Sequence, residues 1–200
     1  MGDSTAVEGM FAQAQKTSLV LQSGPVELAV LTQATLDRSP DLSATLAMWR
    51  KRHQREFLKL EKVTPQGTQN WLNMILRDEA RILFIVSHNG SQIGHLGIGE
   101  FGRGGFEVCD VLRGESSGSG AMSTALQMLL DWTKDIGIPT IFLHVAADAT
   151  KAIAFYHKLS FRPTALLPLV REESDAGVSW TISSEKETPW DRFLIRMEHS

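Results

Sequence analysis

The chain has 200 residues, 42% of them hydrophobic and 22% charged, and its formal net charge is −3. This length and composition predict one globular domain whose core is large enough to fold without metals or disulfides. A slightly acidic chain is a poor candidate for nucleic-acid binding, because such proteins usually carry a basic excess. Cys109 is the only cysteine in the sequence, so an intrachain disulfide and a thiol-rich metal site are both excluded.

The sequence lacks the features of a membrane or secreted protein. No apolar run approaches the roughly 20 residues that span a bilayer, and residues 1–4 do not begin a basic region followed by an apolar stretch. We therefore expect a cytoplasmic protein. Residues 1–18 show no clear hydrophobic period and are expected to form a flexible N-terminal segment, followed by a single domain over residues 19–200.

The first half of this domain is expected to combine antiparallel strands with two helices. Thr64 can cap a helix that has Pro65 in its first turn, where proline is well tolerated. Asn89 and Gly90 form a dipeptide typical of a two-residue hairpin turn. In chain order, the patterns predict strands at residues 19–21 and 26–31, a helix over residues 41–60, a shorter helix from residue 65, and strands at residues 81–86 and 93–101.

The next segment predicts a strand, a glycine-serine loop and a long helix. Residues 106–112 alternate apolar with mostly polar side chains, as in a strand with one buried face. Residues 113–120 break regular structure, and apolar residues then recur every three or four positions from Ala121 to a stop at Gly137. The loop therefore lies at the amino end of a helix, where unpaired N–H groups and the helix dipole favour an anion.

A second strand and helix follow. Residues 140–145 are rich in β-branched and aromatic side chains, as in an interior strand. Asp148 can cap the next helix, whose apolar side includes Tyr156. A buried tyrosine hydroxyl needs a hydrogen-bond partner, and a ligand can provide it. The remaining expected strands are at residues 165–170, 178–182 and 193–197.

In these two motifs the sequence resembles the GNAT superfamily of acyl-CoA-dependent N-acetyltransferases. The family's loop, Gln/Arg-x-x-Gly-x-Gly/Ala, corresponds to residues 115–120, and its second motif, Asn-x-x-Ala-x-x-Phe-Tyr-x-x-x-Gly-Phe, corresponds to residues 149–161. Both occur in the family's order and at its usual separation. Glu115, Ala149 and Ser160 stand where the family usually has Gln or Arg, Asn, and Gly. We therefore expect the loop to bind through its main chain.

The resemblance implies an α/β (α+β) fold whose mixed, mostly antiparallel central sheet is split between two parallel strands and flanked by helices. It also implies acetyl-CoA as co-substrate and no metal. In the family, the CoA arm lies in the split and its diphosphate meets the loop. By position, the cofactor-binding residues are Val111, Leu112, Arg113, Gly118, Ser119, Gly120, Ala121 and Met122, with residues 143–146 on the opposite side of the split.

The catalytic residues follow from the same resemblance and from the strand that enters the split. Tyr156 matches the family's tyrosine near the CoA sulfur and is expected to protonate the thiolate; the alternative is a core tyrosine bonded to a backbone carbonyl. Glu107 and Asp110 point to opposite faces of a regular strand unless a bulge intervenes. We place Glu107 ahead of Asp110 as the general base that takes the proton of the amine. A chain of waters is the alternative route for this proton. Each carboxylate alone is equally compatible with a structural role.

Other candidate groups have simpler explanations. The basic run at residues 50–55 either holds an anionic acceptor or forms a solvated helix face, the usual role of such a run. Trp49 is expected in the core. The histidines show no metal-binding spacing, and His95 and His144 are expected to be core residues with satisfied hydrogen bonds.

We therefore expect an acyltransferase that moves an acetyl or short acyl group from acetyl-CoA to the primary amine of a small molecule, such as an amino sugar, by direct transfer in a ternary complex. The alternatives are a protein N-terminal or lysine acetyltransferase and a non-catalytic CoA-binding regulatory module. Nucleic-acid and membrane partners are not expected. The chain is expected to be a monomer or a homodimer.

Overall fold

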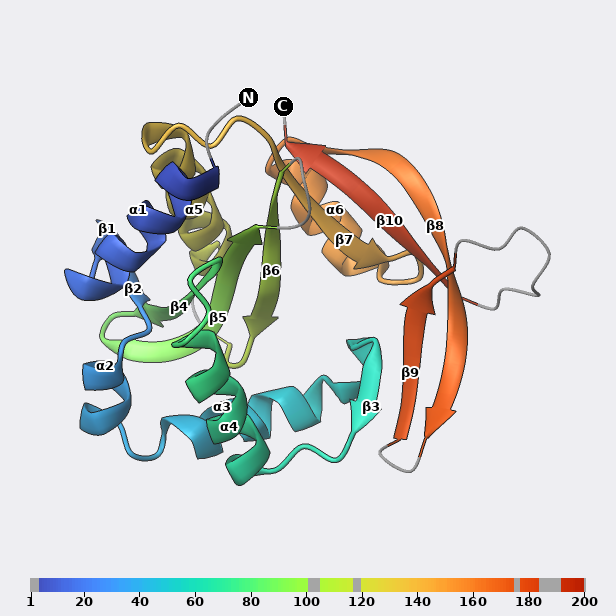
Figure 1. Cartoon of the computed structure of the whole chain (residues 1–200), viewed down its shortest axis with the longest axis horizontal. Helices are drawn as coiled ribbons and strands as arrows, with labels where there is room; N and C mark the ends of the chain where they lie inside the picture. Colours follow the sequence, from blue (N-terminus) through green and yellow to red (C-terminus); the bar gives the residue numbers. More distant parts are fainter. Residues whose placement is uncertain (1–3, 101–104, 117–119, 175–176, 184–191, 200) are drawn as a thin grey trace.

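The computed structural model describes residues 4–100, 105–116, 120–174, 177–183 and 192–199. Within these residues the strands form one ten-stranded sheet in the order β1-β2-β4-β5-β6-β7-β10-β8-β9-β3 (Figure 1). In the described part of the chain, no helix is both long and apolar enough to cross a bilayer. The elements are α1 (Ser4–Lys16), β1 (Val20–Ser23), β2 (Val26–Val30), α2 (Gln33–Arg38), α3 (Leu42–Arg52), η1 (Gln54–Glu56), β3 (Lys59–Glu61), α4 (Pro65–Ile75), β4 (Arg81–His88), β5 (Ser91–Glu100), β6 (Phe106–Arg113), α5 (Ala121–Asp135), β7 (Ile141–Ala146), α6 (Thr150–Lys158), β8 (Phe161–Ser174), β9 (Gly177–Ile182) and β10 (Arg192–His199).

The sheet is split between β6 and β7, as expected. These two strands run parallel, whereas the other paired strands of the described residues are antiparallel. β6 and β7 pair only where Phe106 faces Ile141 and Glu107 faces Phe142. Beyond that point they diverge, each remaining paired with its other neighbour (Figure 1). The divergence leaves one backbone edge of each strand facing the opening.

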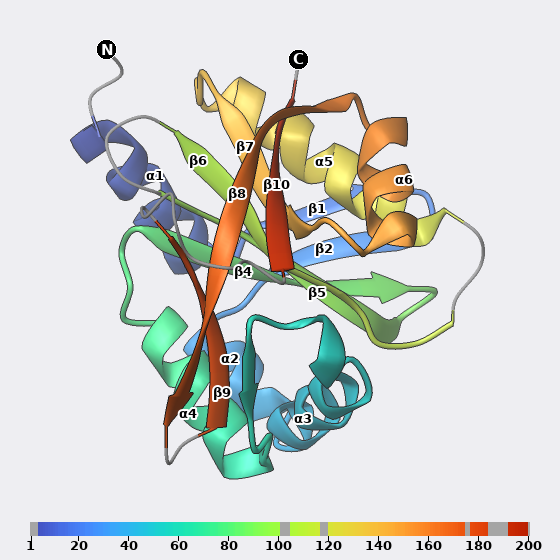
Figure 2. The same cartoon turned by 90° about the vertical axis from the view of Figure 1, so that its right-hand side faces the viewer.

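Apolar side chains pack on both faces of the sheet. Along β4, Ile82 and Phe84 belong to a cluster that includes residues of α1, α5 and α6. The intervening Leu83 and Ile85 belong to a second cluster, with α2, α3 and α4. This alternation follows from the two-residue period of a strand. Figure 2 shows α5 and α6 on one side of the strands and α3 and α4 on the other.

Residues 1–18, expected to be flexible, include the helix α1. Phe11 is 1% exposed, and its ring lies 6.1 Å from that of Trp132 and 5.9 Å from that of Phe106. These partners come from α5 and β6, elements distant in the sequence. Tertiary contacts therefore order the helix, and a search for local hydrophobic period does not detect them.

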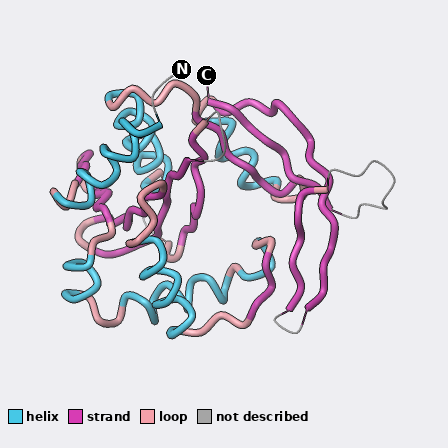
Figure 3. The backbone as a smooth tube through the Cα atoms, in the orientation of Figure 1, coloured by secondary structure: helices cyan, strands magenta, loops and turns pink. Residues whose placement is uncertain are grey.

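The helix expected over residues 41–60 is shorter and ends at Arg52. Basic residues occupy the last turn of α3, where they suit the negative end of the helix dipole. The chain then forms η1 and β3, and Leu60 of β3 pairs with Val178 of β9 at the end of the sheet (Figure 3). Pairing with a strand far along the chain overrides the helical spacing of the apolar residues in this segment.

Most of the local signals are confirmed. Thr64 caps α4, since a backbone N–H of the first turn donates to its hydroxyl at 3.0 Å. Asn89 and Gly90 both have positive φ angles, 51° and 77°, as the hairpin turn requires. The prediction for Asp148 is wrong, because Ala149 occupies the N-cap of α6 and no side chain caps that helix.

Candidate active site

A β-bulge in β6 brings an acidic side chain towards α3 and α4. The register of β5 against β6 shifts between His95 and Gly97, so Asp110 and Val111 stand opposite a single residue of β5. Asp110 takes a left-handed φ of 51°. Beyond the extra residue, each side chain points to the opposite face of the sheet from the one that regular alternation would give. As a result Leu112 packs with the cluster of α3 and α4, whereas Val111 packs with the cluster of α5 and α6.

The first pocket, about 450 Å³, lies between β6, the amino end of α5, and α6. Gly120 is the N-cap of α5, with a φ of 95° and no side-chain capping hydrogen bond. The N–H groups of the first helical turn have no acceptor inside the helix, which suits an anionic ligand. Leu112 contributes its backbone to β6 but its side chain lies on the other face. Of the residues expected to bind the co-substrate, this pocket is lined by Val111, Arg113, Gly120, Ala121 and Met122, whereas Gly118 and Ser119 lie outside the described residues.

Tyr156 projects from α6 into this first pocket. It is 9% exposed, and its ring contacts those of Phe155 and Phe161 at centroid distances of 5.2 and 5.9 Å. Among the described residues its hydroxyl makes no hydrogen bond, in contrast to a core tyrosine tied to a backbone carbonyl. Burial raises the pKa of the Tyr156 phenol, and the nearby Cys109 adds to the effect. The hydroxyl therefore carries its proton at neutral pH.

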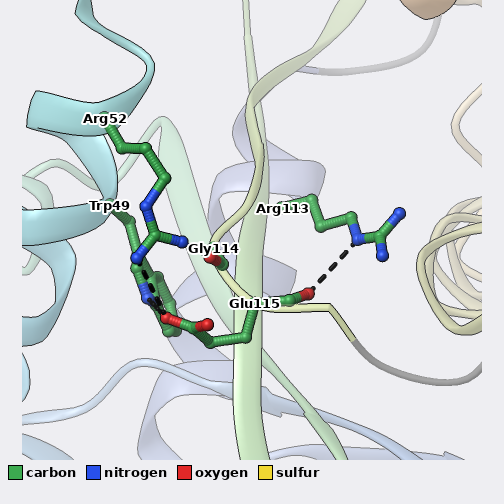
Figure 4. Close-up of polar contacts among 5 residues, drawn as sticks. All are labelled: Trp49, Arg52, Arg113, Gly114 and Glu115. Atoms are coloured by element: carbon green, nitrogen blue, oxygen red, sulfur yellow. Dashed lines mark hydrogen bonds and ion pairs between the residues drawn. The ribbon is translucent and has the colours of Figure 1, made fainter.

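Glu115 at the start of the loop does not line the first pocket, and its carboxylate lies beside Trp49 and Arg52 of α3 (Figure 4). Trp49 Nε1 donates to Glu115 Oε1 at 2.8 Å, and Arg52 Nη2 lies 3.6 Å from the same oxygen. Arg52 Nη1 also donates to the carbonyl of Gly114 at 2.6 Å, and Arg113 Nε donates to the carbonyl of Glu115 at 3.2 Å. An acid at this position is thus neutralised by a cation from α3 and helps to fix the loop.

A second pocket, about 620 Å³, lies on the opposite face of the bulge, between β4 to β6 and the segment from α3 to α4. Asp110 lines it and forms an ion pair with Arg81. His95 lines it too and is 2% exposed. Burial lowers the pKa of His95 to about 4, so its ring is neutral at pH 7. At the bulge the two pockets lie on opposite faces of β6, since Val111 lines the first and Asp110 and Leu112 line the second.

Glu107 is separated from both pockets. One of its carboxylate oxygens lies 2.9 Å from His144 Nδ1, at the closed end of the split. The two side chains are 18% and 11% exposed. Glu107 lines neither of the pockets that flank the bulge, so the structure does not bring it together with Asp110.

Cys109 is poorly suited to carry an acyl group. Burial raises the pKa of its thiol, and the neighbouring Asp110 carboxylate raises it further. The thiol form, which is the weaker nucleophile, therefore dominates at neutral pH. Among the described residues, no cluster of three His, Cys, Asp or Glu side chains is placed to hold a metal ion.

The basic run and the histidines divide into different roles. Trp49 is fully buried, as expected, and Arg50 lines the second pocket. Lys51 is exposed and Arg52 holds the loop. His95 is buried as expected, but neither ring nitrogen has a hydrogen-bond partner within the described residues. The sequence gives no signal that separates His95 from an ordinary core histidine, because its surroundings are formed by the bulge of β6 and by Trp71 of α4, whose ring lies 5.7 Å away.

Comparisons with known proteins agree with this geometry. A model of the acetyltransferase (GNAT) family matches residues 46–161, more than half of the chain. The "uncharacterized N-acetyltransferase YobR" of Bacillus subtilis (strain 168) is 24% identical over 143 residues, which are 68% of this chain and 58% of that protein. The chain thus spans less than two thirds of the length of this relative.

Solved structures share the fold at low identity. The RimL ribosomal L7/L12 α-N-protein acetyltransferase is similar with a TM-score of 0.68 and 13% identity, over 90% of this chain and 93% of that one. The microcin C7 self-immunity acetyltransferase MccE, solved with acetyl-CoA and AMP, is similar with a TM-score of 0.66 and 13% identity, over 88% and 92%. From the family match, the split sheet and the two motifs, we conclude that the chain belongs to the GNAT family of acetyltransferases.

Proposed function

We propose that this protein moves an acetyl or short acyl group from acetyl-CoA to the primary amine of a small molecule by direct transfer in a ternary complex. The observation that carries the proposal is the pair of pockets that flank the bulge of β6, beside the opening between β6 and β7. One is built for an anionic, extended ligand and the other offers a carboxylate. A thioester that reaches through the opening between β6 and β7 would lie next to an amine bound at the bulge, so the transfer would need no acyl-enzyme.

The first pocket suits acetyl-CoA. The uncapped first turn of α5 and Gly120 would receive the diphosphate, because backbone N–H groups there lack acceptors and the helix dipole favours anions. The edge of β6 at Val111 to Arg113 would pair with the amides of the pantetheine arm. Acetyl-CoA supplies the activated acyl group, and the protein residues orient it.

We assign the base to Asp110 ahead of Glu107. Asp110 lines the second pocket, and its ion pair with Arg81 holds the carboxylate in place beside that pocket. Glu107 is engaged with His144 outside both pockets. The bulge, which the sequence does not locate, is the reason for this change of preference.

Tyr156 would act as the acid. In the transfer, the amine nitrogen loses a proton to Asp110 and bonds to the carbonyl carbon. The carbon–sulfur bond then breaks, and the thiolate takes the Tyr156 proton to give CoA and an amide. The Tyr156 phenol is restored when solvent carries the proton from Asp110 to the phenolate. A phenol whose pKa is raised by burial is protonated before each turnover.

The test is release of CoA from acetyl-CoA with a panel of small amines, amino sugars and one peptide, using the wild type and Tyr156→Phe. Phenylalanine keeps the ring contacts with Phe155 and Phe161. We expect kcat to fall by about 100-fold or more, with acetyl-CoA affinity nearly unchanged. Full activity of the variant would remove Tyr156 from the mechanism. Acetyl-CoA binding without turnover of any amine would instead support a regulatory module.

A further inference from the structure

The second pocket contains two buried polar side chains that lack hydrogen-bond partners. Thr68 of α4 is 1% exposed and His95 of β5 is 2% exposed, and both line the pocket. Within the described residues, the Thr68 hydroxyl and both ring nitrogens of His95 make no hydrogen bond. Buried polar groups without partners destabilise a fold, and most of those in native proteins are satisfied. Two such side chains from different elements that line one pocket indicate that a ligand there satisfies them.

Both side chains are neutral, and each can donate and accept a hydrogen bond. Burial lowers the pKa of His95 to about 4, so at pH 7 its ring has one N–H donor and one acceptor nitrogen. The Thr68 hydroxyl also donates and accepts. An ionised carboxylate of a ligand only accepts and an ammonium only donates, and either would bury a charge beside these neutral groups. A hydroxyl of the ligand donates and accepts, so it matches both side chains.

The other residues of this pocket are compatible with an uncharged group at its buried part. Arg81 forms an ion pair with Asp110, and the guanidinium of Arg50 lies over the ring of Trp71, 4.6 Å from its centroid. The two lysines among the lining residues are exposed, where water and salt screen their charges. The ring of Trp71 lies 5.7 Å from that of His95 and provides an apolar wall beside it. Neutral hydrogen-bonding groups next to an apolar wall suit a hydroxylated carbon skeleton.

We propose that the acceptor is a primary amine that carries a hydroxyl group close to its nitrogen, as in an amino alcohol or an amino sugar. The amine lies at Asp110, and His95 and Thr68 hydrogen-bond the hydroxyl. His95 is paired with Leu112, two positions from Asp110, so the two side chains can reach the same small ligand. His95 and Thr68 thus determine specificity and do not take part in the chemistry. This inference rests on the proposed function, since it names the class of amine acylated at the same site.

The first test compares amines that differ in their hydroxyl groups. In two pairs, ethanolamine with propylamine and propanolamine with butylamine, a methyl group replaces the hydroxyl, and glucosamine with cyclohexylamine is a ring pair. CoA release is measured with saturating acetyl-CoA, and kcat/KM is expressed per neutral amine, because a hydroxyl lowers the pKa of a nearby amine. We expect kcat/KM to be at least about 100-fold higher for the hydroxylated member of at least one pair, since its analogue leaves the buried groups unpaired.

Thr68→Val removes one of the two groups and keeps the shape of the side chain. It should lower kcat/KM for the preferred hydroxylated amine by about tenfold, and should leave the alkyl amine and the affinity for acetyl-CoA unchanged. The melting temperature should stay the same or rise, because valine removes an unsatisfied buried hydroxyl.

Thr133→Val is the matched control for this exchange. Thr133 of α5 is also fully buried, but its hydroxyl donates to the carbonyl of Leu130 at 2.8 Å, and it lines neither pocket. The control variant should lower the melting temperature, because a hydrogen bond is lost, and should leave the preference for hydroxylated amines unchanged.

His95→Leu and His95→Asn test the second group. Leucine has no hydrogen-bonding group, whereas the asparagine amide donates and accepts as the neutral imidazole does. We expect His95→Leu to reduce the preference for the hydroxylated amine by at least about tenfold and His95→Asn to retain part of it. A purely structural role of His95 would change the melting temperature of both variants without changing the ratio of kcat/KM between the two amines.

The outcomes separate the two proposals. Equal turnover of hydroxylated and alkyl amines, or a preference in Thr68→Val and His95→Leu equal to that of the wild type, would overturn this inference and leave the proposed function intact. Turnover confined to a peptide amino terminus would also overturn it. Acetyl-CoA binding by calorimetry without CoA release for any amine would overturn the proposed function, and this inference with it.

Discussion

Gly114→Ala tests the contact that fixes the start of the loop against α3. A methyl group added at Gly114 would lie 1.9 Å from Trp49 Cδ2 and 2.2 Å from Cε2, where ordinary contact begins near 3.4 Å. The φ angle of Gly114 is not left-handed, so the cost arises from space and not from the backbone. Trp49 is fully buried, and its indole would have to retreat by about 1.5 Å.

The expected decrease in the free energy of unfolding has two contributions. Overpacking of a core typically costs about 1–3 kcal/mol, and a hydrogen bond to a charged group contributes about 1.5–3 kcal/mol. The displaced indole would lose its 2.8 Å bond to Glu115. We therefore expect the free energy of unfolding to fall by roughly 3–5 kcal/mol, a large share of the roughly 5–15 kcal/mol available to a domain.

Urea unfolding followed by tryptophan fluorescence measures this change. Gly9→Ala is the matched control, because a methyl group at Gly9 in α1 meets nothing within 4 Å. It should stabilise the protein by up to about 1 kcal/mol, as alanine does in a helix. Trp49→Leu should cost less in the Gly114→Ala background than in the wild type. Equal stabilities of Gly114→Ala and the wild type would refute the packing argument.

Two further predictions concern the strands beside the bulge. The pKa of His95 is lowered from 6.5 to about 4, so between these pH values the unfolded chain binds a proton at His95 that the folded chain does not bind. The free energy of unfolding should therefore fall by about 3 kcal/mol as the pH falls from 6.5 to 4. Urea unfolding at several pH values should show this decrease in the free energy of unfolding for the wild type and not for His95→Asn. The same dependence on pH in both proteins would contradict the burial argument. Because the pKa of the Cys109 thiol is raised, mass spectra of the protein mixed with acetyl-CoA alone should show no acetylated Cys109. Cys109→Ser should also keep most of the activity. An acetyl adduct at Cys109 would contradict direct transfer.

The sequence predicts the fold well where local pattern and tertiary structure agree. The alternation of β6, the turn at Asn89 and the apolar period of α5 each depend on neighbouring residues. The two motifs identify the family, and the first pocket contains Tyr156 together with Val111 and Arg113 of β6 and Ala121 and Met122 of α5, whereas Leu112 turns to the other face. These features are encoded locally and can be read without knowing the partners.

The parts that could not be predicted depend on distant contacts. Phe11 is ordered by rings of β6 and α5, and Leu60 joins a strand because β9 is available. In the sequence, Glu115 appears as an unpaired acid at the start of an anion-binding loop. In the structure its carboxylate contacts Trp49 and Arg52 of α3.

The bulge had the largest consequence for the site. A one-residue shift in the pairing of β5 with β6 places Asp110 in the second pocket with His95. The alternation of apolar and polar residues along β6 does not reveal this shift. The unpaired hydroxyl of Thr68 is equally hidden, because its sequence position suggests only a helix interior. The pocket that we propose for the acceptor is therefore visible only in the structure, whereas the region proposed for the co-substrate is already indicated by the sequence.

The most direct test of the central claim is the affinity for acetyl-CoA of Ser123→Glu and Ser123→Gln, measured by calorimetry. Ser123 lies in the first turn of α5 and lines the first pocket. Glutamate there suits the helix dipole and should not lower stability, but a charge about 6 Å from a diphosphate costs roughly 1–3 kcal/mol per phosphate charge. We predict that the wild type and Ser123→Gln bind acetyl-CoA and that Ser123→Glu binds at least about tenfold more weakly. No binding by the wild type, or equal binding by the two variants, would contradict the placement of the diphosphate at this helix.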